Sequence, residues 1–158
     1  MKRIAALFAS WSVAALAFGH SAPNSLVRFD FLPHSVRAQL LVPVSELDFA
    51  TAAERTPATF EAYLLRHVAA EAPDGARWNI AIETVRATTF FDHDYLLTEI
   101  VMTPPPGATA GRFVFIDDAV THEVRNHVVM LVANGADEPR FLGALQYPAR
   151  RLLIERTH

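Results

Sequence analysis

No cysteine occurs among the 158 residues of this sequence, and its absence excludes several kinds of chemistry. Disulfide bonds, thiolate metal sites, cysteine nucleophiles and lipid anchors attached to a cysteine are all ruled out. The stability of the protein must therefore come from the packing of its core and not from covalent cross-links.

Lysine is almost absent as well. The only lysine is Lys2, and every later cationic side chain is an arginine. The net charge is −3, and no stretch gathers the arginines into a basic patch. Because nucleic acids are bound through such patches, we expect no nucleic-acid partner.

Long apolar runs are missing too, apart from one at the N-terminus. A positively charged start precedes an apolar stretch over residues 4–18, and the stretch ends near two small residues, Ala17 and Gly19. This arrangement is typical of a secretory signal peptide, and about 15 apolar residues are too few for a membrane span of roughly 20. We predict a signal peptide over residues 1–19, with cleavage after Gly19 and His20 as the mature N-terminus.

The mature chain is expected to be exported to the periplasm or the extracellular space. No later segment has about 18 uninterrupted apolar residues, so we expect a soluble chain without a membrane span. Its 139 residues (158 less the 19 of the signal peptide) are enough for one domain with a core of its own. Since neither a linker nor a repeat divides them, we predict a single domain over residues 20–158.

Most of the mature chain alternates apolar and polar residues with the period of two that is typical of β-strands. The strands are expected at residues 24–31, 36–42, 78–90, 95–103, 111–116, 122–133, 141–146 and 152–155. Short strands separated by frequent turns predict a mostly β fold, an antiparallel β-sandwich.

One α-helix is expected to be inserted among these strands, at about residues 57–71. Pro57 suits the first position of a helix, and Phe60, Leu64 and Val68 recur at every fourth residue. The segment 44–50 is expected to form only a short helical turn, with a serine as its cap.

Histidines are the polar residues best suited to chemistry in this chain. After cleavage, His20 would carry a free α-amine and an imidazole, and the two groups together can chelate one metal ion. The amine, with a pKa of about 7.7, loses its proton readily, and imidazole suits copper, nickel and zinc. We therefore expect a copper or nickel ion at His20. The alternative is that His20 is only the residue that follows the cleavage site.

Three other histidines are candidates to complete this site. His93 lies in an Asp-His-Asp cluster between two strands, and His122 and His127 lie in Thr-His-Glu-Val-Arg-Asn-His. On a regular strand, residues five apart point to opposite faces, so His122 and His127 share a site only if a bulge or a loop intervenes. The alternative is one histidine bonded within the sheet and one on the surface. We expect His67 to lie at the edge of the helix's apolar face, without a metal.

Nucleophilic catalysis finds little support in the sequence. There is no Gly-x-Ser-x-Gly motif, and no cluster places a serine, a histidine and a carboxylate together. The Gly-Ala-Thr-Ala-Gly segment lacks the lysine of a phosphate-binding loop. We therefore expect the protein not to be an enzyme.

Three stretches taken together resemble a known family. They are HSAPNSLVRFDF after the signal peptide, DDAVTHEVRNHVVMLV, and FLGALQYPARRLLIER. In this order they are similar to the extracytoplasmic N-terminal region of the HupE/UreJ family of membrane proteins. That region opens with a His-Pro-Met-Pro-Asn-Ser-like stretch, continues with Thr-His-x-Val-x-x-His, and reaches Gln-Tyr-Pro or Gln-His-Pro before the first membrane helix.

The resemblance implies a link with nickel supply and a membrane protein as partner. His20 and Ser25 correspond to the opening motif, and His122 and His127 to the later one. Ser21 and its neighbour replace the family's proline and methionine, which removes a thioether that could bind a soft metal. The chain also ends where the family continues into membrane helices, so a permease activity does not carry over.

Two functions from different classes remain open. The first is an exported domain that binds or handles copper or nickel through His20. The second is a non-catalytic interaction module that docks a membrane transporter or assembly, with histidines that are only structural.

Overall fold

The structure is a computed structural model that describes residues 23–51, 57–135 and 138–156. The expected signal peptide and His20 lie outside these residues, so both stay predictions.

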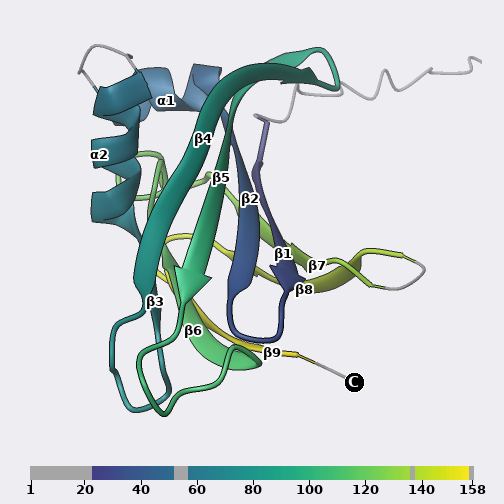
Figure 1. The fold of residues 1–158 in the computed structure, drawn as a ribbon. Helices are drawn as coiled ribbons and strands as arrows, with labels where there is room; N and C mark the ends of the chain where they lie inside the picture. Colours follow the sequence, from purple (N-terminus) through teal and green to yellow (C-terminus); the bar gives the residue numbers. More distant parts are fainter. Residues whose placement is uncertain (1–22, 52–56, 136–137, 157–158) are drawn as a thin grey trace, which may run out of the picture.

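Nine strands and two helices make up the described part of the chain (Figure 1). In chain order they are β1 (Ser25–Phe31), β2 (Val36–Pro43), α1 (Val44–Ala50), α2 (Pro57–His67), β3 (Val68–Glu71), β4 (Asn79–Phe90), β5 (His93–Thr103), β6 (Arg112–Asp117), β7 (Val129–Ala133), β8 (Arg140–Leu145) and β9 (Arg151–Glu155).

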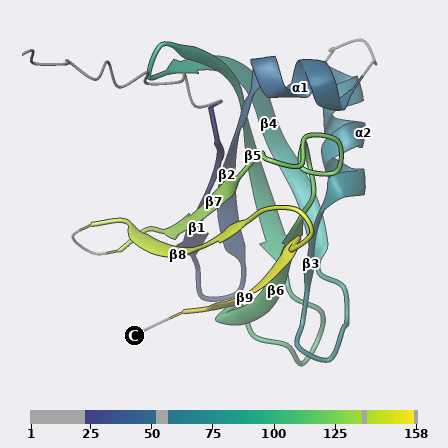
Figure 2. The same ribbon diagram turned by 180° about the vertical axis from the view of Figure 1, so that it is seen from behind.

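The strands form two sheets, one of six strands in the order β4-β5-β2-β1-β7-β8 and one of three in the order β3-β6-β9. All neighbours are antiparallel except β1 and β7, which run parallel. Figure 2, seen from behind, shows the smaller sheet in front of the larger one, with α2 along one side and α1 across one end. The prediction of a mostly β, sandwich-like fold is confirmed.

The core lies between the two sheets, where the alternation of the strands turns apolar residues inward. On β1, Val27 and Phe29 are buried, while Arg28 between them points to the outer face. The ring of Phe29 meets the rings of Phe113 and Phe115 edge to face, at centroid distances of 5.7 and 5.0 Å. These contacts join the larger sheet to the smaller one.

The expected helix at 57–71 is shorter in the structure, and its last residues form a strand. The helix ends at His67, and Val68 begins β3, which pairs with β6. Val68 and Ala70 are buried and alternate with less buried residues, so the same apolar residues also fit the period of a strand. The segment Val44–Ala50 forms a true helix, α1, whose N-cap residue is Pro43 and not the expected serine.

The expected strand at 122–133 is also shorter, because only Val129–Ala133 pairs with neighbouring strands. The residues before it turn back on themselves: the Val124 N–H donates to the Val120 carbonyl, and the His127 N–H donates to the Val124 carbonyl. This loop, residues 118–128, lies beside α2 in both views (Figures 1 and 2). Within the residues that the structure describes, no helix is long and apolar enough to cross a membrane.

Candidate functional site

The three described candidate histidines lie in three different settings. His93 begins β5, is exposed, and faces Phe90 at the end of the β4–β5 hairpin. His122 lies in loop 118–128 and contacts α2, whereas His127, in the same loop, is buried under β1. His122 and His127 therefore have separate partners.

His127 belongs to a buried group with Ser25 and Glu46. Its Nε2 lies 2.8 Å from the Ser25 Oγ, and its Nδ1 lies 3.7 Å from the Glu46 Oε2. The expectation that no serine, histidine and carboxylate come together is therefore wrong. The reason is tertiary: the pairing of β1 with β7 closes a separation of 102 residues between Ser25 and His127.

Burial decides what this group can do. Burial lowers the pKa of His127 to about 4 and raises the pKa of Glu46, so it disfavours the charged form of both side chains. Within the described part of the chain the His127 Nδ1 makes no hydrogen bond, and Ser25 is only 3% exposed. A serine that is closed to substrate is not set up for nucleophilic attack. The group instead holds the start of β1 against loop 118–128.

A second histidine group is more open, and it joins His122 to His67 at the end of α2. The two imidazole rings stack with their centroids 4.2 Å apart and their planes 19° from parallel. Asp118 contacts both: its Oδ1 lies 2.8 Å from the His67 Nδ1, and its carbonyl oxygen lies 3.0 Å from the His122 Nδ1. One aspartate thus orients both rings.

These contacts settle which nitrogen of each ring carries the proton. A backbone carbonyl and an ionised carboxylate only accept hydrogen bonds, so the Nδ1 of each ring is the donor. In a neutral imidazole the other nitrogen, Nε2, then carries a lone pair. Among the described residues, neither the His67 Nε2 nor the His122 Nε2 has a hydrogen-bond partner. The pair therefore presents two nitrogen atoms that are able to bind a metal.

The pairing of β3 with β6 explains why His67 and Asp118 meet. Val68 lies opposite Asp117 in that antiparallel pair, so the residues just beyond them face each other. The Asp118 N–H donates to the His67 carbonyl at 3.1 Å. The sequence alone does not show this pairing. From the sequence, His67 was expected only to lie at the edge of the helix's apolar face, without a metal.

The turn that carries His122 is strained. Val120 has a φ of 65°, a left-handed conformation that a β-branched residue rarely adopts. Such strain costs on the order of 1–3 kcal/mol and persists only where the surroundings hold it. Here Val120 is fully buried, and its N–H donates to the Tyr63 hydroxyl at 2.9 Å. Burial raises the pKa of Tyr63 to about 12, so this hydroxyl stays protonated.

Charge around the pair is balanced by an arginine. The Arg150 Nη1 lies 3.1 Å from the Asp118 Oδ2, while the Asp118 Oδ1 faces His67. Within the described ranges, no group of three or more histidine, aspartate or glutamate side chains is arranged to hold a metal ion. His67 and His122 by themselves could supply two nitrogen ligands, and any further ligand would have to come from elsewhere.

No model of a known protein family matches this chain. No curated protein matches it significantly either. The HupE/UreJ resemblance consequently rests on the three sequence stretches alone.

Proposed function

We propose that this chain is an exported domain that binds a transition metal, copper or nickel. The proposal is carried by the His67–His122 pair, whose Nδ1 atoms both bond to Asp118 and whose Nε2 atoms have no partner among the described residues. Histidine ligands of metals usually donate their other ring N–H to a carboxylate or a backbone carbonyl, which is the arrangement found here.

His20 is the proposed additional ligand, through its α-amine and its imidazole. It precedes Ser25, the first residue of β1, by five positions, which an extended chain spans with at most about 18 Å. The Ser25 N–H donates to the Val128 carbonyl, at the end of the loop that carries His122. The first residue of β1 is thus hydrogen-bonded to the loop that carries His122, which supports a shared site.

Metal binding would have to turn the two rings. The two ring planes are 19° from parallel, whereas the ligands of one ion must converge on it at about 2 Å. Each ring would turn about its last side-chain bond, and the hydrogen bonds to Asp118 would limit how far it turns.

Calorimetric titration with Cu²⁺ and Ni²⁺ tests the proposal on a chain that begins at His20. We expect one ion per chain, with affinity at least about tenfold lower, or 1.4 kcal/mol, in His67→Gln and in His122→Gln. A chain with one extra residue before His20 should also bind more weakly, because its histidine no longer has a free amine.

His93→Gln is the matched control, because it removes an exposed histidine of the hairpin and leaves the pair intact. It should bind as the unaltered chain does. If all five forms bind equally, or none binds, the metal proposal is wrong.

A second candidate function, an interaction module that docks a membrane protein, is supported by the tip of the β4–β5 hairpin. Phe90 and Phe91 are 41% and 81% exposed, and their rings lie 4.4 Å apart. Two large apolar side chains at the end of a projecting hairpin are typical of a contact surface. Failure of every metal titration would leave this function as the better account.

A further inference from the structure

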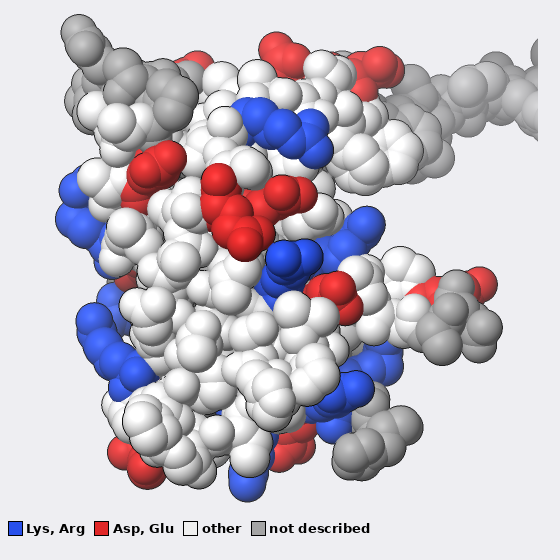
Figure 3. Space-filling model, viewed as in Figure 1, with Lys and Arg blue, Asp and Glu red and all other residues white. Residues whose placement is uncertain are grey.

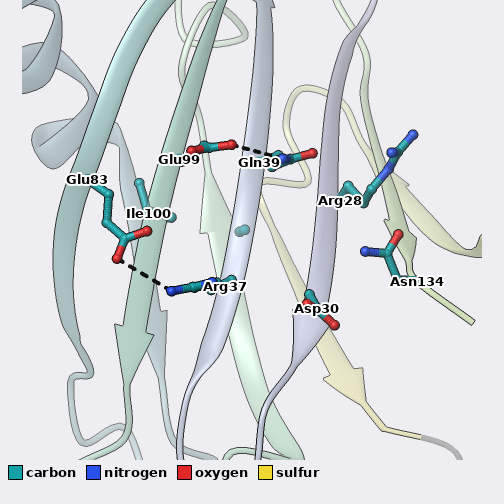
Figure 4. Close-up of a pocket in the computed structure, with 9 residues that line it drawn as sticks. Arg28, Asp30, Arg37, Gln39, Glu83, Glu99, Ile100 and Asn134 are labelled. Carbon is teal, nitrogen blue, oxygen red and sulfur yellow. Dashed lines mark hydrogen bonds and ion pairs between the residues drawn. The ribbon is translucent and has the colours of Figure 1, made fainter.

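The outer face of the six-stranded sheet carries a hollow of about 380 Å³. Figure 3 looks onto this face and shows it hollowed on the right, with acidic and basic side chains gathered around its middle. Figure 4 shows the residues that line it, which come from β1, β2, β4, β5 and the end of β7. Its volume is within the range of sites for small molecules.

The acidic side chains of the hollow on β4 and β5 already have partners. Glu99 accepts hydrogen bonds from the Gln39 Nε2 at 3.0 Å and from the Thr84 Oγ1 at 3.3 Å. Glu83 lies 3.9 Å from the Arg37 Nη2, in an exposed ion pair. These two carboxylates are therefore at least partly compensated within the protein.

Arg28 is different, because its guanidinium has no partner in the described part of the chain. Its Nε is buried and makes no hydrogen bond. Its neighbour across the strand pair is Gln39, whose amide nitrogen is already directed to Glu99. Asp30, two residues along β1, forms no ion pair with it. A buried donor without an acceptor is unfavourable, and an incoming acceptor would remove that penalty.

Asn134 stands beside this arginine. In Figure 4 the side chains of Arg28 and Asn134 lie on the same side of β1, away from the two glutamates. The Asn134 N–H donates to the Phe29 carbonyl at 2.8 Å, which fixes the backbone of Asn134 next to β1. The hollow thus has a cationic donor end at β1 and an acidic end at β4 and β5.

We propose that this hollow binds a small polar molecule through an anionic group, a carboxylate or a phosphate, held by Arg28 and Asn134. The planar guanidinium matches the two oxygens of such a group, and the amide of Asn134 supplies one more donor. Glu83 and Glu99 lie across the hollow, so the other end of the ligand carries hydrogen-bond donors, as an ammonium group does. A free amino acid has both features.

The test follows the Arg28 Nε–H resonance by NMR during titrations at constant ionic strength. The probes are glutamate, inorganic phosphate and ethanolamine, with sodium chloride as the salt control. We expect a saturable shift with glutamate, and none with ethanolamine, which lacks an anionic group. A shift with phosphate as strong as that with glutamate would assign the site to phosphate groups.

Variants distinguish a specific binding site from general electrostatic attraction. Arg28→Lys keeps the charge but loses the Nε donor, and we expect at least a tenfold lower affinity, read from backbone amides of β1 and β2. Arg112→Gln removes a paired cation on the other sheet, outside the hollow, and it should bind as before. If Arg28→Lys binds like the unaltered chain, or if sodium chloride reproduces the shifts, the proposal is overturned. None of these residues belongs to the histidine pair, so the outcome is independent of metal binding.

Discussion

At the scale of single residues, two buried ionisable side chains respond to pH in opposite directions. Burial raises the pKa of Asp117 to about 7, so the folded protein keeps a proton there that an unfolded chain releases above about pH 3.8. Burial lowers the pKa of His127 to about 4, so the folded protein lacks a proton that an unfolded chain binds below about pH 6.5. Between about pH 4 and 6.5 the Asp117 contribution to stability falls as pH rises, whereas that of His127 increases.

Replacing Asp117 should therefore remove its share of the pH dependence of stability and leave that of His127. In Asp117→Asn the amide oxygen still accepts from the Ala119 N–H, but the carboxyl group is gone. Relative to the unaltered protein, we expect the variant to gain stability as pH rises from about 4 to 7, by roughly 4 kcal/mol in total. Free energies of unfolding in urea, measured across this range, test the expectation.

A difference between variant and parent that does not change with pH would contradict the prediction. His127→Gln is the matched comparison, because it should show the opposite trend. Relative to the parent it should gain stability as pH falls below about 6.5, where the buried imidazole of the parent resists protonation.

At the scale of elements, the β4–β5 hairpin has a turn that does not suit its residues. Phe90 pairs with His93, so Phe91 and Asp92 form a two-residue turn, with φ values of 46° and 61°. Turns with positive φ at both positions favour Asn-Gly, and a bulky residue there is strained. A phenylalanine that is 81% exposed gives little burial in return.

The double replacement Phe91→Asn with Asp92→Gly should therefore stabilise the domain. We expect a gain of about 1 kcal/mol, since the new residues adopt positive φ without strain. The free energy of unfolding in urea measures this change. Asp74→Ala, in a different turn, is the control and should give no gain, because it removes the hydrogen bond from the Ala76 N–H. A loss of stability in the hairpin variant would show that the aromatic tip contributes to folding.

At the scale of the whole molecule, the aromatic contacts between the two sheets are central to stability. Phe29 on the larger sheet packs against Phe113 and Phe115 on the smaller one, and all three are fully buried. The smaller sheet has only three strands, and β6 is the middle one. Loss of this packing would also release β3, which positions His67 beside Asp118.

Phe115→Ala should destabilise the protein by about 3–5 kcal/mol, because it leaves a cavity between the sheets. Phe141→Ala is the matched control: this ring is 59% exposed, so its removal should cost no more than about 0.5 kcal/mol. Urea unfolding followed by circular dichroism distinguishes the two. Equal effects of the two replacements would contradict the placement of the core.

Much of the architecture could be predicted because it depends on local periodicity. The alternation in residues 24–31 and 36–42 predicts the β1–β2 hairpin, and Phe29 falls on its buried face. The four-residue repeat from Phe60 predicts α2, although not its end, because Val68 fits a helix and a strand equally well. The spacing rule for His122 and His127 assumed a continuous strand, and loop 118–128 is folded differently.

The sequence by itself determined the absence of thiol chemistry, the mostly β fold class and the choice of histidines as the groups to examine. Only the tertiary structure decided which histidines meet. His127 lies against Ser25 because β1 pairs with β7, and His67 lies against Asp118 because β3 pairs with β6. Periodicity is a property of neighbouring residues and is legible in one chain, whereas the choice of strand partners depends on how all the apolar faces are buried together.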